Sequence, residues 1–344
     1  MFLIYSLMLL VLSISIFKFA NYYNIALDED FNKPQAIHKL SKPRILGLPV
    51  FAILVYLFLS NHVIIEFNLL VLFSIICSFA GLLDDFGVKI RPSLRFIFQA
   101  LIISSLFFLS DSLNPINKLD FLPPIFDNYI FLNFFTIFAI LTIANSFNFT
   151  DGCNGLIILY SLLIFFVLLI LSNNQFLSIF CVLLIIYLTI ILFFNFPNAK
   201  AFLGDFGAYF LGFILSFLVI FVSNNKDLLN FDFNEWFFAT LFLYPSFEIF
   251  TTITRRLISL KSPFYPDNLH FHSILFRLLA SKLGNKKANY STSLIIFLIN
   301  IVIFISLFFI PINYYYLNYL IGFILFFLLR SFLKNKLFKL GLQK

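Results

Sequence analysis

The segment 145–156 holds a dense group of polar side chains between two long apolar runs, 129–144 and 156–172. The residues in it that could bind a ligand or a metal are Asn145, Asn148, Asp151 and Asn154. Apolar runs of this length are typical of a bilayer, where each unpaired polar group costs several kcal/mol. The pattern indicates a site at a membrane boundary. Taken alone, it fits equally well a loop whose Asn and Asp residues cap a helix.

Carboxylates stand at the ends of two other apolar runs. Asp84 and Asp85 are adjacent, and adjacent carboxylates raise each other's pKa unless a cation lies nearby. Lys89, Arg91, Arg95 or a divalent metal would supply that positive charge, whereas a solvated turn is the structural alternative. Asp205, flanked by glycines before an apolar run, is either a helix N-cap or a metal ligand beside a phosphate.

The last long polar segment is basic and contains two of the four histidines. Arg255 and Arg256 precede it, and His270 and His272 alternate about a phenylalanine. In an extended segment both histidines would face one way, so we interpret them as an anion-binding pair rather than a structural one. Glu248 lies in the preceding apolar run, two helical turns before Arg255, and an ionisable residue in such a run is typical of a functional site.

Composition indicates which elements must position these residues. The 344-residue chain is 61% hydrophobic and 11% charged, with a mean hydropathy of +1.00, which excludes an ordinary soluble domain. A membrane helix needs about 20 mainly apolar residues. We therefore predict an all-α polytopic membrane protein forming a single domain, 1–344, with an uncleaved first helix. The predicted spans are 2–20, 45–61, 63–83, 94–110, 129–146, 156–172, 176–195, 207–223, 235–253, 293–311 and 315–333.

The distribution of basic residues predicts how these eleven spans are oriented. With alternating loops, every Lys and Arg except Lys118 and Lys226 falls on one side. The positive-inside rule makes that side cytoplasmic, with the N-terminus outside and the C-terminus inside. All the polar segments described above then face the cytoplasm. This favours an enzyme with an interfacial site over a transporter, whose coupling residues should lie near the middle of the bilayer.

Taken in order, the motifs resemble those of the polyprenyl-phosphate N-acetylhexosamine-1-phosphate transferases (glycosyltransferase family 4), which include the lipid I translocase. The resemblance extends over about 28–280, and the loop with His38, Pro43-Arg44 and Gly47 is similar to the family's N-terminal loop. The motifs that carry it are Asp84-Asp85, Asn145-x-x-Asn148-x-x-Asp151-Gly, Phe202-Leu-Gly-Asp205-x-Gly207, and Arg255-Arg256 leading to Ser-Pro-Phe-x-Pro-Asp-x-x-His270-x-His272.

The resemblance implies transfer of a sugar 1-phosphate from a UDP-N-acetylhexosamine to undecaprenyl phosphate, with release of UMP. It places the enzyme in the bacterial inner membrane, with its site facing the cytoplasm, at the start of a lipid-linked surface polysaccharide such as an O-antigen. The implied partners are the two substrates and membrane lipid, with a homodimer as one option and no nucleic acid. The implied cofactor is Mg²⁺, with Mn²⁺ as the alternative.

The resemblance also implies roles for individual residues. Asn148 and Asp205 are the expected metal ligands, and Asp84, Asp85 and Asp151 are the expected catalytic acids. Asp84 or Asp85 would orient the lipid phosphate, bind metal or accept a proton. Substrate binding is expected at His38, Lys89, Arg95, Asn145, Asn154, Arg255, Arg256, His270 and His272.

Departures from the family pattern leave the donor sugar open among GlcNAc, FucNAc, QuiNAc and GalNAc. Where this chain has Asn154, many members carry an acid, and where it has Asn268, many carry Arg. Where it has Glu248, many carry Asp, and where it has Ser273, many carry a third histidine. The main alternative function is a transporter or flippase for a lipid-linked or anionic solute. A prenyl-transferring enzyme that uses Asp84 and Asp85 on a diphosphate is a third hypothesis, but a second aspartate-rich motif is missing from the sequence.

Overall fold

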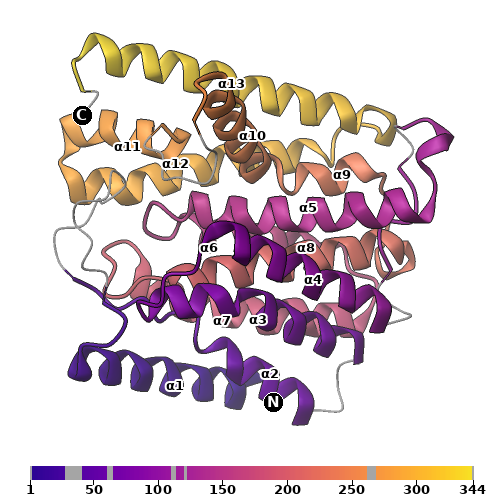
Figure 1. Ribbon diagram of the computed structural model, residues 1–344, viewed down its shortest axis with the longest axis horizontal. Helices are drawn as coiled ribbons and strands as arrows, with labels where there is room; N and C mark the ends of the chain where they lie inside the picture. The colour runs from indigo at the N-terminus through magenta and orange to yellow at the C-terminus, as the bar shows by residue number, and fades with distance from the viewer. Residues whose placement is uncertain are drawn as a thin grey trace.

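The computed structural model of the chain is a bundle of α-helices that lie mostly along one direction (Figure 1). It describes residues 2–27, 41–59, 65–109, 114–119, 122–261 and 269–342. The helices in these ranges are α1 (Phe2–Tyr23), α2 (Val50–Leu59), α3 (Ile65–Asp85), α4 (Pro92–Leu109), α5 (Tyr129–Thr150), α6 (Leu156–Leu171), α7 (Gln175–Asn195), α8 (Gly204–Asn224), α9 (Glu235–Thr240), α10 (Leu243–Ile258), α11 (Phe271–Leu283), α12 (Asn285–Ser306) and α13 (Tyr315–Lys339). Short 3-10 turns are η1 (Pro124–Phe126), η2 (Lys226–Leu228) and η3 (Ile312–Tyr314).

Eight helices of the described part are long and apolar enough to cross a membrane. They are α1, α3, α4, α5, α7, α8, α12 and α13. This confirms the prediction of an all-α polytopic membrane protein. Of the other three predicted spans, α6 is an apolar helix of 16 residues, α2 covers ten, and the run 235–253 is divided between two helices. The orientation derived from the basic residues stays a prediction.

The run 235–253 was predicted as one helix, but the chain turns between α9 and α10. Pro245 lies in the first turn of α10, where its missing N–H group leaves no helical hydrogen bond unmade. A new helix can therefore begin here at a different angle, and α10 crosses the direction of its neighbours (Figure 1). Because α10 continues to Ile258, Arg255 and Arg256 belong to its last turn rather than to a loop.

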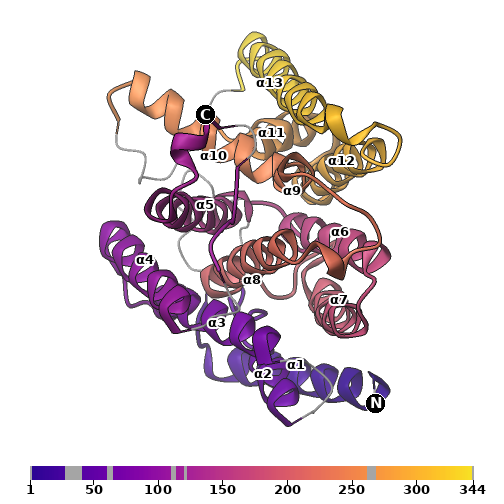
Figure 2. The ribbon, with the colours of Figure 1, turned by 90° about the vertical axis from the view of Figure 1, so that its right-hand side faces the viewer.

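Helix α8 is at the centre of the bundle, with α3, α5 and α6 around it (Figure 2). Glycines allow this packing, because small residues at a helix interface let two backbones approach closely. A Cβ at Gly212 would lie 2.6 Å from Cα of Ala144 in α5, and one at Gly207 would lie 3.0 Å from Cα of Gly47. This close contact brings the C-terminal turns of α5 next to the first turns of α8.

The segment 41–47 reaches the start of α8 through backbone pairing. Phe202 donates its N–H to Pro43 O at 2.8 Å and accepts from Ile45 N at 3.2 Å. Gly47 N then donates to Leu203 O at 3.1 Å. These bonds satisfy backbone groups of two irregular segments that are about 160 residues apart in the sequence. They also place Arg44 next to the first turn of α8.

Candidate active site

The first turn of α8 is capped by a carboxylate from another helix. Asp85, the last residue of α3, accepts the backbone N–H groups of Asp205 and Phe206, each at 2.9 Å. These are two of the N–H groups that a helix N-terminus leaves without an internal partner. Gly204 has a φ of +82°, and a Cβ there would lie 2.6 Å from Oδ2 of Asp85. Asp85 is thus engaged in holding the turn that carries Asp205.

Two arginines connect the acids of α3 with Asp205. Nη1 of Arg44 lies 3.6 Å from Oδ1 of Asp85 and 3.6 Å from Oδ1 of Asp205. Nη1 of Arg95 contacts Oδ2 of Asp84 at 2.5 Å and lies 4.0 Å from Oδ2 of Asp205. The Asp205 side chain keeps 27% of its surface exposed, whereas that of Asp85 keeps 1%. Asp205 is therefore the acid of this group that is most open to a ligand.

Asn145 and Asn148 lie on the last turns of α5, because this helix continues to Thr150 and not to 146 as predicted. The Tyr209 hydroxyl donates to Oδ1 of Asn145 at 3.2 Å. Asn148 is among the groups that interact electrostatically with Tyr209, so it belongs to the same surroundings. The Arg95 guanidinium covers the Tyr209 ring at 5.0 Å.

Asp151 is the C-cap residue of α5 and completes the acid cluster. Desolvation raises the pKa of Asp151 to about 7; repulsion by Asp205 adds to this and Arg44 opposes it. Interaction with both groups shows that Asp151 belongs to the same electrostatic environment as the start of α8. We call the four carboxylates of this site, with the two arginines that face them, the acid cluster. Its members are Asp84, Asp85, Asp151, Asp205, Arg44 and Arg95.

The acid cluster is short of positive charge, because four carboxylates face two guanidinium groups. A divalent cation would offset this excess when the acids are ionised. Within the described ranges, no group of three or more His, Cys, Asp or Glu side chains is placed to hold a metal by itself. Mg²⁺ in proteins commonly has one or two protein ligands and takes its other oxygens from water and substrate phosphates. The carboxylate of Asp205 and the amide oxygen of Asn148 fit that requirement.

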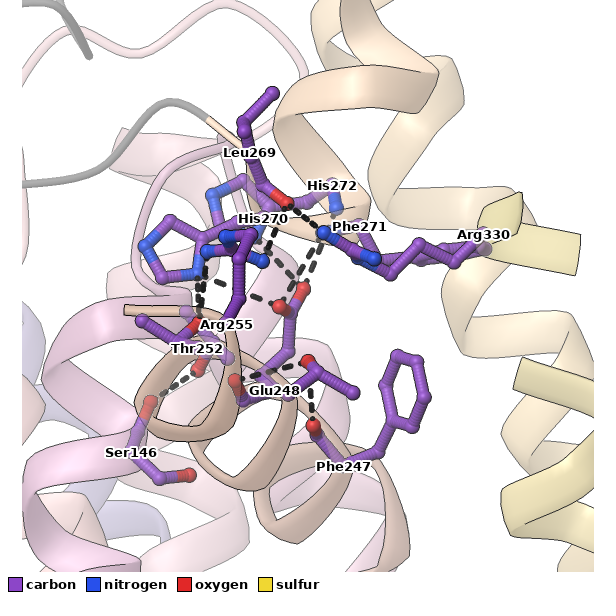
Figure 3. Close-up of polar contacts among 12 residues, drawn as sticks. Ser146, Phe247, Glu248, Thr252, Arg255, Leu269, His270, Phe271, His272 and Arg330 are labelled. Carbon is purple, nitrogen blue, oxygen red and sulfur yellow. Dashed lines mark hydrogen bonds and ion pairs between the residues drawn. The ribbon is translucent and has the colours of Figure 1, made fainter. Parts of the chain in front are cut away.

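The two histidines stand at the start of α11, not in the extended loop that the sequence suggested. His270 is the N-cap residue, and its Nδ1 lies 3.3 Å from Oε2 of Glu248. Nδ1 of His272 lies 3.3 Å from Oε1 of the same carboxylate (Figure 3). The backbone N–H groups of Phe271 and His272 also donate to Glu248, at 3.2 and 3.4 Å. The buried Glu248 of α10 therefore caps α11 and contacts both imidazoles.

The histidines lie against the end of α5, next to the acid cluster. The ring of His270 is 6.2 Å from that of Phe149. A Cβ added to Gly152 would collide with Nε2 of His272. Since Gly152 follows Asp151 directly, the start of α11 and the acid cluster share one site.

The contact between Gly152 and His272 leads to a testable prediction. Gly152→Ala is expected to lower kcat/KM by about tenfold or more, because displacing a substrate-positioning group by about 1 Å can cost up to 10²-fold. The assay is product formation by Gly152→Ala, His272→Ala and the double variant. If the alanine acts by displacing His272, the double variant will match His272→Ala. Losses that simply add would contradict this mechanism.

Asn154 makes contacts that hold the turn after α5. Its side-chain amide donates to Pro197 O at 2.9 Å, and its backbone N–H donates to Oδ1 of Asn289 at 2.7 Å. The residue is 7% exposed. These bonds fix the turn against the segment before α8 and against α12, so they describe a structural role. The substrate-binding role expected for Asn154 stays a prediction.

The other predicted binding residues are spread around the site. Lys89 is exposed on the turn after α3, and Arg256 is partly exposed on α10. Arg255 lies near the histidines and donates to Leu269 O at 3.4 Å. His38 lies outside the described residues. The functional roles of all these residues stay predictions.

Three residues in or beside the site were not selected from the sequence. Tyr209 lies one turn after Asp205, a spacing that would have put both on one face of a helix. Arg44 ends a basic loop, and only its pairing with 202 reveals its position. Arg330, 8% exposed on α13, donates to Leu269 O at 3.1 Å. The sequence feature that could have identified Arg330 is that it is the only arginine in the apolar run 315–333.

Comparison with known proteins identifies the segment that carries most of this site. Residues 67–223 match the family model described as glycosyl transferase family 4. The match covers less than half of the chain, so it shows that this segment is similar to glycosyl transferase family 4. The segment contains the four carboxylates of the acid cluster together with Asn145 and Asn148. The family resemblance predicted from the motifs is therefore confirmed.

Two curated relatives agree with the family match. An undecaprenyl-phosphate alpha-N-acetylglucosaminyl 1-phosphate transferase of Thermotoga maritima is 33% identical over 146 residues, 42% of this chain and 43% of that protein. A phospho-N-acetylmuramoyl-pentapeptide-transferase of Dictyoglomus turgidum is 33% identical over 217 residues, 58% of this chain and 64% of that protein. The matched regions thus span less than two thirds of either relative.

Proposed function

We propose that this chain transfers a sugar 1-phosphate from a UDP-N-acetylhexosamine to undecaprenyl phosphate and releases UMP. The reaction would take place at the cytoplasmic face of a bacterial inner membrane and start a lipid-linked surface polysaccharide. The observation that carries the proposal is the acid cluster, in which four carboxylates at the ends of α3, α5 and α8 meet Arg95 of α4 and Arg44 of the segment 41–47. The family match and the two relatives support the same class of reaction.

The arrangement suits phosphoryl transfer, which depends on neutralised phosphates and aligned oxygens more than on covalent help from the protein. Mg²⁺, when bound by Asp205 and Asn148, would neutralise and align the phosphates of the donor. Arg44 and Arg95 would add positive charge beside the reacting groups. His270 and His272 would contact the nucleotide sugar from the side of α11.

Asp84 is better placed to orient the lipid phosphate through Arg95 than to act as a base. Its Oδ1 accepts the backbone N–H of Ile90 at 2.9 Å, and its Oδ2 pairs with Arg95. Both oxygens are therefore already engaged. A phosphate monoester has a second pKa of about 6 and is mostly dianionic at neutral pH, so it needs no strong base to attack.

The proposal is tested with the purified full-length chain in detergent, undecaprenyl phosphate and Mg²⁺. UDP-GlcNAc, UDP-GalNAc, UDP-FucNAc and UDP-QuiNAc are supplied separately, and release of UMP is measured together with formation of the lipid product. One of these donors is expected to give stoichiometric UMP and lipid-linked sugar phosphate. Absence of both products with every donor, from protein that unfolds cooperatively, would refute the transferase.

Removal of the metal is expected to abolish this activity. With the donor identified above, excess EDTA should reduce UMP release to background, because four carboxylates then face the substrate phosphates without a cation. Added Mg²⁺ should restore the rate, and Mn²⁺ should restore part of it. Full activity in EDTA, with the metal content of the protein checked by mass spectrometry, would exclude the metal from the reaction.

A further inference from the structure

The carboxylate of Glu248 is fully buried between α10 and α11, where it has an unusual number of partners. Oε1 accepts the Tyr244 hydroxyl at 2.9 Å, and the backbone N–H groups of Phe271 and His272 contact the two oxygens. A buried carboxylate is tolerated only when such donors satisfy it. These three bonds alone account for Glu248 as a structural cap.

The two imidazole contacts go beyond what a cap requires. Nδ1 of His270 meets hydrogen-bond geometry with Oε2. Nδ1 of His272 lies 3.3 Å from Oε1, at ion-pair distance, but this contact does not meet hydrogen-bond geometry. A carboxylate can only accept, so each contact is favourable when Nδ1 carries a proton. Both imidazoles face the carboxylate through Nδ1, so the carboxylate favours the tautomer with the proton on Nδ1 in both of them.

The ring planes show where the opposite nitrogens lie. The imidazoles of His270 and His272 are stacked, with centroids 5.3 Å apart and planes 7° apart. With both Nδ1 atoms on Glu248, both Nε2 atoms lie on the opposite side of the stack. Nε2 of His272 reaches Gly152, and the ring of His270 lies near Phe149. That side is the end of α5, next to the acid cluster.

Thr252 offers a competing partner for His270. Its Oγ1 lies 3.3 Å from Nδ1 of His270, the same distance as the carboxylate oxygen. A hydroxyl that donated to Nδ1 would select the other tautomer. The charged carboxylate is the stronger acceptor, and Arg255 Nη2 lies 3.5 Å from Oγ1 of Thr252, where the hydroxyl oxygen accepts. The geometry thus favours a proton on Nδ1.

We propose that Glu248 is a positioning residue that keeps the proton of His270 and of His272 on Nδ1 and thereby turns both Nε2 atoms toward the nucleotide sugar. The part that concerns the substrate rests on the proposed function. The part that concerns the tautomers does not, because they exist in the protein without substrate.

The tautomers are measured by ¹⁵N NMR of histidine-labelled full-length protein in detergent at pH 8. Signals are assigned with His270→Gln and His272→Gln. In the wild-type protein both rings are expected in the Nδ1–H form. In Glu248→Gln the oxygen can still accept from the backbone, but the amide N–H₂ group will face an imidazole Nδ1. At least one ring is therefore expected to switch to the Nε2–H form. Wild-type rings in the Nε2–H form would overturn the proposal.

Kinetics provide the second arm, with the donor found active in the panel. Glu248→Gln is expected to raise KM for the nucleotide sugar about tenfold with a smaller change in kcat, and Glu248→Asp to recover part of the loss. Tyr244→Phe is the matched control, because it removes a donor to Glu248 without touching either imidazole. Equal losses in Tyr244→Phe and Glu248→Gln would overturn the proposal in favour of a purely structural cap. An inactive wild type would instead refute the transferase and leave the NMR result valid.

Discussion

Replacing Asp205 by Asn is expected to lower kcat by about 10²- to 10³-fold, the usual loss when one electrostatic stabiliser of a transition state is removed. The side chain lies between Arg44 and Arg95 and is the most exposed carboxylate among those they pair with. It is therefore the group that substrate phosphates and a cation reach first. The substitution keeps the shape of the side chain and removes its charge.

Folding should survive this change. The other acids repel Asp205, so losing its charge relieves part of the repulsion within the acid cluster. UMP release and the thermal unfolding midpoint are measured together on the same preparation. Asp227→Asn is the matched control, because Asp227 is exposed in η2, in a segment on the opposite face from the predicted site. Wild-type turnover in Asp205→Asn would remove the metal-ligand assignment.

The apolar runs were sufficient to predict the fold class, because hydrophobic length alone identifies helices that cross a bilayer. They were less informative about where helices end. The run after 129 loses its apolar character at Asn145, yet α5 continues to Thr150. The last turns persist because Asn145 bonds Leu141 O and Tyr209 within the protein. Such tertiary partners cannot be read from local hydropathy.

The order of the motifs identified most of the acid cluster but not how its parts are held. Arg44 reaches the site only because 41–47 pairs with 202–203 across a long stretch of sequence. The cap from Asp85 depends on Gly81, where a Cβ would lie 2.8 Å from the backbone of Asp205. Both arrangements require close tertiary approach of segments that are distant in the chain. The sequence shows that a glycine stands at such a position, but it does not show which distant segment packs against that glycine.

The cap at the start of α8 distinguishes Asp85 from the adjacent Asp84, although the sequence predicted the same catalytic role for both acids. Asp85→Asn is expected to lower the free energy of unfolding by about 1–3 kcal/mol, because an amide has one oxygen where the buried carboxylate has two. One of the N–H groups at the start of α8 would then lose its acceptor. Activity should fall with stability, since this turn carries Asp205. Gly204→Ala should reproduce both effects by forcing a Cβ into the Asp85 carboxylate.

Asp84→Asn provides the contrast. An Asn side chain keeps an oxygen that can accept the backbone N–H of Ile90, so the substitution removes only the charge that pairs with Arg95. The variant should therefore lose activity with little loss of stability. Unfolding in detergent and UMP release distinguish the two positions. If Asp85→Asn unfolded like the wild type while Asp84→Asn did not, the roles would be reversed and Asp85 would have to act on the substrate itself. The structure argues against this, because the two oxygens of Asp85 are already bound to the backbone of α8.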